Sequence, residues 1–305
     1  MSFAWPGLVS AMQLVIPEPG EKTDSQRDPA RWVTLPGLCC QAVGGRPNST
    51  LEVSAAWFLL FTAAHIVDSI EDGDNDPLIN KLGGTGVAIN TTNGLFLSAV
   101  MLLQSMDAKE IPKGLVAKIT ADYLETILGM TSGQHLDLTL QEISLDQWWQ
   151  IAEAKSGAFF SLACRSGAQF GTSDPLKVHA FSEYGFHVGL MLQIMDDLED
   201  FQLLLNSGEI ASPRSLERSL AAAYAHEILP SAIKEEFTQL IRIGAAGEEM
   251  SDRFLDILDE CGAGLYMVAE LEKHYELGMA ALREAQPASP ALEKLEEIIG
   301  VLKAN

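Results

Sequence analysis

The chain has 305 residues, of which 47% are hydrophobic, so it is long enough to bury a sizeable core and is not largely disordered. Its formal net charge of −22 argues against nucleic acid and anionic membrane surfaces as partners, because both are negatively charged. The same charge would repel a phosphate substrate, so binding one requires metal ions.

The first 30 residues are predicted to form a separate N-terminal segment. An apolar run at residues 7–16 predicts a short helix, and it lacks the basic flank and cleavage pattern of a signal peptide. Residues 17–30 are rich in proline and charged residues, which predicts a polar loop.

The remaining residues, 31–305, are predicted to form one all-α domain. No long stretch alternates with a period of two, β-branched residues are sparse, and no internal repeat is present. Polar residues interrupt the apolar stretches before they reach transmembrane length, so no membrane span is expected. The helix after a break at 139–144 is expected to be capped by Asp146. The other expected helices cover residues 36–43, 51–71, 87–106, 112–130, 175–200, 215–227, 230–245, 249–285 and 289–303.

Two acidic clusters each follow an apolar helical run. The sequence G-L-M-L-Q-I-M-D-D-L-E-D-F at residues 189–201 places Asp196 and Asp200 four residues apart, so they share one helix face. An earlier cluster repeats this spacing with Asp68 and Asp72. Charges at the end of a buried helix are costly unless they are paired or bind metal. The pattern therefore predicts two carboxylate pairs that face one another and hold Mg²⁺ over an apolar pocket.

Further motifs lie between and beside these clusters in a recognisable order. Gly94-Leu95 follows the first cluster, G-Q-H-L-D-L stands at 133–138, and Lys155-Ser156-Gly157 precedes the second cluster, which begins with Gln193. In the order and spacing of these motifs, the chain resembles the trans-isoprenyl diphosphate synthase (polyprenyl synthetase) family of the isoprenoid synthase superfamily. The resemblance covers residues 31–303.

The resemblance implies an isoprenoid synthase fold, a single bundle of roughly ten or more helices around a central cavity. It implies an allylic prenyl diphosphate as substrate and Mg²⁺ as cofactor, with about three ions present when substrate is bound. Mg²⁺ and a lysine would stabilise the departing diphosphate. The implied metal ligands are Asp68, Asp72, Asp196 and Asp200. The implied catalytic residues are these four with Asp197 and Lys155. The residues implied around the substrate are Gln134, Asp137, Ser156 and Gln193.

The depth of the substrate pocket can also be predicted. In the family, the residues four and five positions before the first aspartate limit the length of the prenyl chain, and here they are the small Ala64 and Ala63. Leu60 and Trp57 would lie beneath them, and Trp57 is about 16 Å from Asp68 along a helix. We expect a pocket for a substrate longer than farnesyl, floored by Trp57 or Leu60.

The chain departs from the family pattern in two respects. Ser69 stands where a second aspartate is usual in the first cluster. The basic residues that normally hold isopentenyl diphosphate are also scarce: residues 73–86 contain only Lys81, and Arg214 and Arg218 are the bases that follow the second cluster.

These departures favour a class I terpene synthase, which ionises one allylic diphosphate of farnesyl to geranylgeranyl length or longer without isopentenyl diphosphate. Three alternatives remain open. The first is a prenyltransferase with another acceptor. The second is an ordinary elongating synthase with relocated basic residues, and the third is a non-catalytic subunit.

The sequence also suggests a location and an assembly state. The cysteines include no C-x-x-C pair, which indicates neither a zinc site nor a disulfide framework and predicts a cytoplasmic protein. The resemblance implies a homodimer formed through helices such as 87–106 and 112–130.

Overall fold

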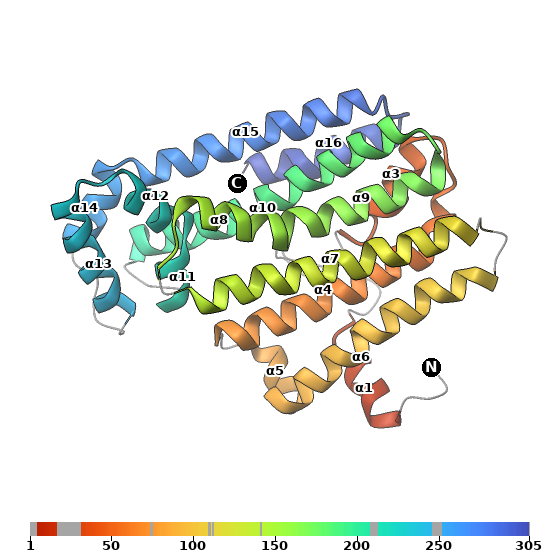
Figure 1. Cartoon of the computed structure of the whole chain (residues 1–305), viewed down its shortest axis with the longest axis horizontal. Coiled ribbons are helices and arrows are strands. Elements are labelled where there is room, and N and C mark those ends of the chain that lie inside the picture. Colours follow the sequence, from red (N-terminus) through yellow and green to blue (C-terminus); the bar gives the residue numbers. More distant parts are fainter. Residues whose placement is uncertain are drawn as a thin grey trace. The chain divides into compact units, whose positions relative to one another are not determined.

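A computed structural model describes residues 5–16, 32–73, 76–108, 111, 113–140, 142–207, 213–245 and 252–304. Every regular element in these ranges is helical and none is a strand, as Figure 1 shows from α1 in red to α16 at the blue end. The all-α fold class is therefore confirmed. The polar loop expected at residues 17–30 lies outside the described residues.

The chain divides into two compact units, and each is described by itself. The first consists of Met1–Leu124, Ala163–Val178 and Pro287–Ala291. The second consists of Glu125–Leu162, His179–Gln286 and Leu292–Asn305. The helices α7 (Lys113–Thr139), α9 (Ala158–Gly171) and α10 (Pro175–Ser207) contribute residues to both units, and the single domain at 31–305 stays a prediction.

The first unit is built around α4. Its elements are α1 (Pro6–Leu14), α3 (Leu35–Ala42), the 3₁₀ turn η1 (Pro47–Thr50), α4 (Leu51–Asp72), α5 (Pro77–Leu82), α6 (Thr85–Gln104) and the 3₁₀ turn η2 (Ser105–Ala108). α4 packs along α6, and both contact the short α5. The phenol of Tyr123 on α7 adds a buried hydrogen bond of 3.0 Å to the carbonyl oxygen of Val53 on α4.

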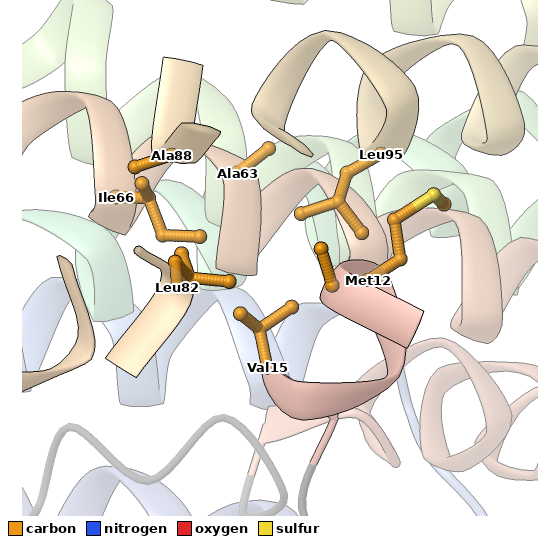
Figure 2. Packing of buried hydrophobic residues seen from close by; sticks show 8 residues of the cluster. Met12, Val15, Ala63, Ile66, Leu82, Ala88 and Leu95 are labelled. Carbon is orange, nitrogen blue, oxygen red and sulfur yellow. The ribbon is translucent and has the colours of Figure 1, made fainter. Parts of the chain in front are cut away.

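Apolar side chains from α1, α4, α5 and α6 form the core of this unit, as Figure 2 shows. Ile66 of α4 and Leu95 of α6 are fully buried there, each contributing about 1.5–3 kcal/mol relative to an exposed side chain. Figure 2 also shows Ala63 of α4 in the same cluster. One face of α4 is thus committed to the core, which leaves a different face for its aspartates.

The second unit begins within α7 and contains the remaining elements. They are α8 (Leu145–Ala152), the π-helical turn η3 (Glu153–Gly157), α11 (Pro213–Arg218), α12 (Leu220–Ile228), α13 (Ser231–Ala245), α14 (Asp252–Glu260), α15 (Ala263–Glu284) and α16 (Ala291–Ala304). α12 packs against α8 and α15, so the region after the second acidic cluster folds back onto α8.

Several expected helix boundaries are wrong, and each has a local cause. Residues 73–86, which lie outside the expected helices, contain α5, because Asp76 accepts a hydrogen bond of 2.8 Å from the backbone N–H of Leu78 and caps that helix. The helix expected at 249–285 is broken where Gly262 adopts a left-handed φ of +75°, which glycine tolerates and other residues rarely do.

The cap of α8 also differs from the prediction. Ser144, rather than Asp146, forms a capping box with Gln147, in which each side chain bonds the backbone N–H of the other residue. Serine one position before the helix satisfies the N–H groups that a residue inside the first turn cannot reach.

Among the residues that the structure describes, two helices are long and apolar enough to cross a membrane, which corrects the expectation that no stretch reaches that length. They are Pro47–Asp72 and Thr85–Gln104, each with a mean hydropathy of 1.5. Their most apolar windows are 50% and 33% buried inside the structure. A helix packed in a protein core passes the same test, so length and composition are weak evidence for a span.

Candidate active site

The first acidic cluster lies on the last turns of α4. Asp68 and Asp72 are half-buried and share a helix face, and the helix ends at Gly73, whose φ of +75° stops further turns. Ser69 points to a different side and is only 5% exposed. The serine found in place of the usual aspartate is therefore directed inward, and the two carboxylates at spacing four remain on one face.

An aromatic and apolar stripe continues down the same face of α4. Trp57, Phe61 and Ala64 precede Asp68 at helical spacings of three and four, and the rings of Trp57 and Phe61 lie 5.4 Å apart. Ala64 is half-buried, whereas Ala63 packs in the core against α6. The two alanines, both predicted to limit the length of the prenyl chain, therefore lie in different surroundings.

Leu60 and Trp57, predicted as the pocket floor, are 1% and 0% exposed. Both sit within the first unit. Their role as a floor stays a prediction.

In the second unit, three helical segments meet at glycines. A side chain added at Gly189 on α10 would lie 2.2 Å from the carbonyl oxygen of Ser156, and one at Gly157 would lie 2.8 Å from the ring of Phe186. A Cβ at Gly133 on α7 would lie 2.8 Å from the methyl of Ala154. Glycine at these positions lets α7 and α10 approach the π-helical turn more closely than any other residue would allow.

Lys155 and Ser156 stand on that π-helical turn. Such turns insert an extra residue into a helix and redirect its side chains, and they are frequent at functional sites. The Ser156 hydroxyl donates a hydrogen bond of 2.9 Å to Oε1 of Gln193, which lies one turn beyond Gly189 on α10. The structure therefore brings these predicted residues together.

The G-Q-H-L-D-L motif lies beside them, near the end of α7. Gln134 is 9% exposed, and neither atom of its amide has a hydrogen-bond partner within the described residues. Buried amides are normally satisfied, so this one is typical of a site that a ligand completes. Asp137 lies 3.6 Å from the ammonium of Lys155 and 2.8 Å from the guanidinium of Arg218.

The second acidic cluster follows Gln193 along α10. Asp196 and Asp200 are half-buried and share a face, and Glu199 between them is exposed. Asp197 is bound elsewhere: its Oδ2 accepts a hydrogen bond of 3.0 Å from the indole of Trp148 and another from the backbone N–H of Leu220. It therefore holds α8 and the start of α12 against α10.

The pKa of Asp197 is raised to about 8, chiefly by burial and also by the neighbouring charges of Asp196 and Asp200, whereas the two hydrogen bonds oppose the shift. Asp197 was predicted as a catalytic residue on the strength of its place in the motif. In the structure, Oδ2 of Asp197 accepts hydrogen bonds from two N–H groups of the protein, and these bonds join α8 and α12 to α10.

The predicted site residues thus form two groups, one in each unit. The first unit contains Trp57, Leu60, Ala63, Ala64, Asp68 and Asp72, and the second contains Gln134, Asp137, Lys155, Ser156, Gln193, Asp196, Asp197 and Asp200. The catalytic role of Asp197 stays a prediction. That the two acidic clusters face one another stays a prediction. Two residues with a place in the second group, Arg218 and Trp148, were not assigned a role from sequence.

The described residues contain no group of three or more histidine, cysteine or acidic side chains placed to hold a metal ion. A Mg²⁺ site does not require one, because this ion keeps several waters and takes one or two carboxylates together with substrate phosphates. Carboxylate pairs such as Asp68 with Asp72 and Asp196 with Asp200 supply the oxygen donors that such an ion prefers. The four cysteines are free thiols.

Comparisons with known proteins identify related enzymes. A short chain isoprenyl diphosphate synthase of Methanothermobacter thermautotrophicus is 26% identical over 277 residues, which cover 85% of this chain and 78% of the relative. A farnesyl diphosphate synthase of Geobacillus stearothermophilus is 26% identical over 242 residues, covering 76% of this chain and 78% of the relative. These relatives support the predicted class of isoprenoid diphosphate-dependent enzyme.

Solved structures show the same fold. The geranylgeranyl pyrophosphate synthetase of Pyrococcus horikoshii matches with a TM-score of 0.78 at 20% identity, over 98% of this chain and 95% of that structure. The polyprenyl synthetase of Streptomyces coelicolor matches with a TM-score of 0.77 at 19% identity, over 98% and 93%. A family model described as polyprenyl synthetase matches residues 34–205, more than half of the sequence. The chain therefore belongs to the polyprenyl synthetase family.

Proposed function

We propose that the protein is a Mg²⁺-dependent prenyltransferase that ionises an allylic prenyl diphosphate. The observation that carries the proposal is the group formed by Lys155, Ser156 and Gln193. Close helix contacts and a hydrogen bond hold this group together, and Gln193 lies one turn before Asp196 on α10. A cation, oriented hydrogen-bond donors and paired carboxylates are what a metal-bound diphosphate leaving group requires.

The carboxylates are proposed as metal ligands in two pairs, Asp68 with Asp72 and Asp196 with Asp200. Each pair presents its oxygens on one helix face, a donor set that suits a hard divalent cation. Bound Mg²⁺ would neutralise the diphosphate and stabilise the charge that develops as the C–O bond breaks. About three ions with substrate bound is the family expectation, and it remains part of the proposal.

The chain's own residues bind and orient the diphosphate. Because Ser156 donates to Oε1 of Gln193, the Nε2 amide group of Gln193 is the end left to donate to an anion. Lys155 supplies a positive charge from a side chain that is 20% exposed, so it reaches solvent and ligand. Gln134 offers a buried amide with both atoms available.

The prenyl chain would lie along the stripe of Trp57, Phe61 and Ala64 on α4, because an allylic cation needs walls that exclude water. Small Ala64 leaves room beneath Asp68 for a chain longer than farnesyl. Ala63 is not proposed to line the pocket, because its methyl group packs against α6.

A class I terpene synthase is the second candidate. It is favoured by the shortage of basic residues: Lys81 is exposed on α5, and Arg218 is bound to Asp137. An elongating synthase binds two diphosphates and needs more positive charge than a terpene synthase, which binds one.

Product analysis separates the two candidates. The protein would be incubated with Mg²⁺ and geranyl, farnesyl or geranylgeranyl diphosphate, each with and without isopentenyl diphosphate, and products identified by mass spectrometry. A longer prenyl diphosphate formed only with isopentenyl diphosphate supports the prenyltransferase. A cyclic hydrocarbon or alcohol formed without it supports the terpene synthase and contradicts the first proposal.

We also propose a homodimer formed through α6. Leu97 and Met101, one turn apart on α6, are 66% and 57% exposed, so they form an adjacent apolar pair that a dimer interface would cover. Leu97→Glu is expected to shift the protein from dimer to monomer in light scattering. A monomeric wild-type protein would contradict this proposal.

A further inference from the structure

Asp137 binds two cations that come from different elements. Its Oδ1 lies 2.8 Å from Nη1 of Arg218 on α11, and its Oδ2 lies 3.6 Å from Nζ of Lys155 on the π-helical turn. All three side chains are mostly buried, being 12%, 15% and 20% exposed in the order Asp137, Arg218 and Lys155. Charge interactions between them are therefore screened less than on the surface.

Arg218 is held more firmly than Lys155. Besides the carboxylate of Asp137, its guanidinium donates to the backbone carbonyl oxygens of Asp137 and Leu140. These carbonyls lie at the C-terminal end of α7, where the last carbonyls of a helix lack partners within the helix. The planar fork of arginine can reach several acceptors at once, whereas the single ammonium of lysine is one point of charge.

The two cations compete for one carboxylate. With Arg218 bound at 2.8 Å, much of the negative charge of Asp137 is already compensated, and Lys155 stays at the longer distance of 3.6 Å. Without Arg218, the uncompensated charge of Asp137 would attract Lys155 more strongly. A diphosphate would then have to displace that pairing before it could use the lysine.

We propose that Arg218 is a positioning residue: by neutralising Asp137, it keeps the ammonium of Lys155 available to the substrate diphosphate. This inference rests on the proposed function, since it assumes that Lys155 binds that diphosphate. Arg218 would then support the site indirectly, from a short helix that follows the second acidic cluster.

Two variants separate this role from simple capping of α7. Arg218→Gln keeps an N–H donor for the carbonyls but loses the positive charge. Arg218→Lys keeps the charge but loses the fork. We expect Arg218→Gln to raise KM for farnesyl or geranylgeranyl diphosphate about tenfold, with kcat changed less than about threefold. The diphosphate must break the pairing of Lys155 with Asp137 when it binds, and this cost is the same in the ground state and the transition state. Arg218→Lys is expected to raise KM less than about threefold.

A double variant tests the mechanism directly. In Arg218→Gln combined with Asp137→Asn, the carboxylate that retains Lys155 is removed, so KM should return at least severalfold toward the wild-type value. If both Arg218 variants lower the melting temperature alike and leave KM unchanged, or if the double variant restores nothing, the inference is wrong and Arg218 only caps α7. A wild-type protein that releases no diphosphate from any allylic substrate would instead remove the proposed function, and this inference with it.

Discussion

Gly189 lies so close to Ser156 that a Cβ on the glycine would be 2.2 Å from the serine's carbonyl oxygen. This contact joins α10 to the π-helical turn and places Gln193 within hydrogen-bonding distance of Ser156. The geometry of the candidate site therefore depends on a residue that has no side chain.

Gly189→Ala is expected to destabilise the fold, because a backbone atom rather than a flexible side chain blocks the added methyl group. Overpacking of this kind typically costs about 1–3 kcal/mol, measured by urea unfolding. Gly129→Ala is the matched control: its added Cβ meets nothing within 4 Å, and removing a helical glycine should stabilise by up to about 1 kcal/mol. Equal effects in the two variants would contradict the close contact.

Asp197 should tolerate replacement of its charge but not of its hydrogen-bonding oxygen. Asp197→Asn keeps an oxygen to accept from Trp148 and Leu220, whereas Asp197→Leu leaves both donors unsatisfied at a cost of about 1–3 kcal/mol each. Unfolding curves should therefore separate the two variants, with Asp197→Asn near wild type. Comparable loss of stability in both would indicate that the negative charge itself is required.

The length of the prenyl chain should depend on Ala64. Ala64→Phe is expected to shift substrate preference toward shorter allylic diphosphates, because the ring would fill the stripe beneath Asp68. Ala63→Phe should instead destabilise the protein by about 1–3 kcal/mol, since it overpacks the core between α4 and α6. An unchanged substrate profile in a folded Ala64→Phe variant would place the pocket elsewhere.

A buried histidine pair should make stability fall in mild acid. The Nδ1 atoms of His187 and His274 lie 2.9 Å apart. The pKa of His274 is lowered to about 4, chiefly by burial and also by the nearby His187 and Lys273. Glu270 lies 3.8 Å from the other ring nitrogen of His274. A histidine pKa that is lower in the folded protein than the usual 6.5 means that protonation favours unfolding.

The contribution of His274 is thus fully present above pH 6.5 and is lost as the pH falls toward 4. Between pH 7.5 and 5 the loss should be about 2 kcal/mol, measured by urea unfolding at each pH. His274→Gln should show a shallower dependence over the same range. Parallel curves for the two proteins would mean that other groups control the response to acid.

The sequence predicted those parts of the site that follow from helical spacing. Asp68 with Asp72 and Asp196 with Asp200 share faces as their spacing requires. The hydrogen bond between Ser156 and Gln193, both predicted to lie around the substrate, was not itself predicted. Helical spacing could not show that Asp197 hydrogen-bonds to other helices. Its partners Trp148 and Leu220 belong to α8 and α12, which are distant from Asp197 in the sequence. Arg218 escaped assignment for the same reason, since its acceptors lie at the end of α7.

The ends of helices were also difficult to predict from the sequence. The sequence predicts Asp146 as the cap of α8, whereas the structure caps this helix with Ser144 and Gln147. The break at Gly262 was missed because apolar residues recur with helical spacing on both sides of it. A single glycine in a helical pattern is often tolerated, so only the backbone conformation showed that this one ends a helix.

The most direct test of the account is diphosphate release by carboxylate variants. Wild type, Asp68→Asn, Asp196→Asn and Glu199→Gln would each be incubated with Mg²⁺ and farnesyl or geranylgeranyl diphosphate, with isopentenyl diphosphate present, and inorganic diphosphate measured over time. The account predicts release by wild type and by Glu199→Gln, whose carboxylate is exposed, and loss of at least about a hundredfold in the two aspartate variants with unchanged circular dichroism. Full activity in Asp68→Asn or Asp196→Asn, or no release by wild type, would contradict it.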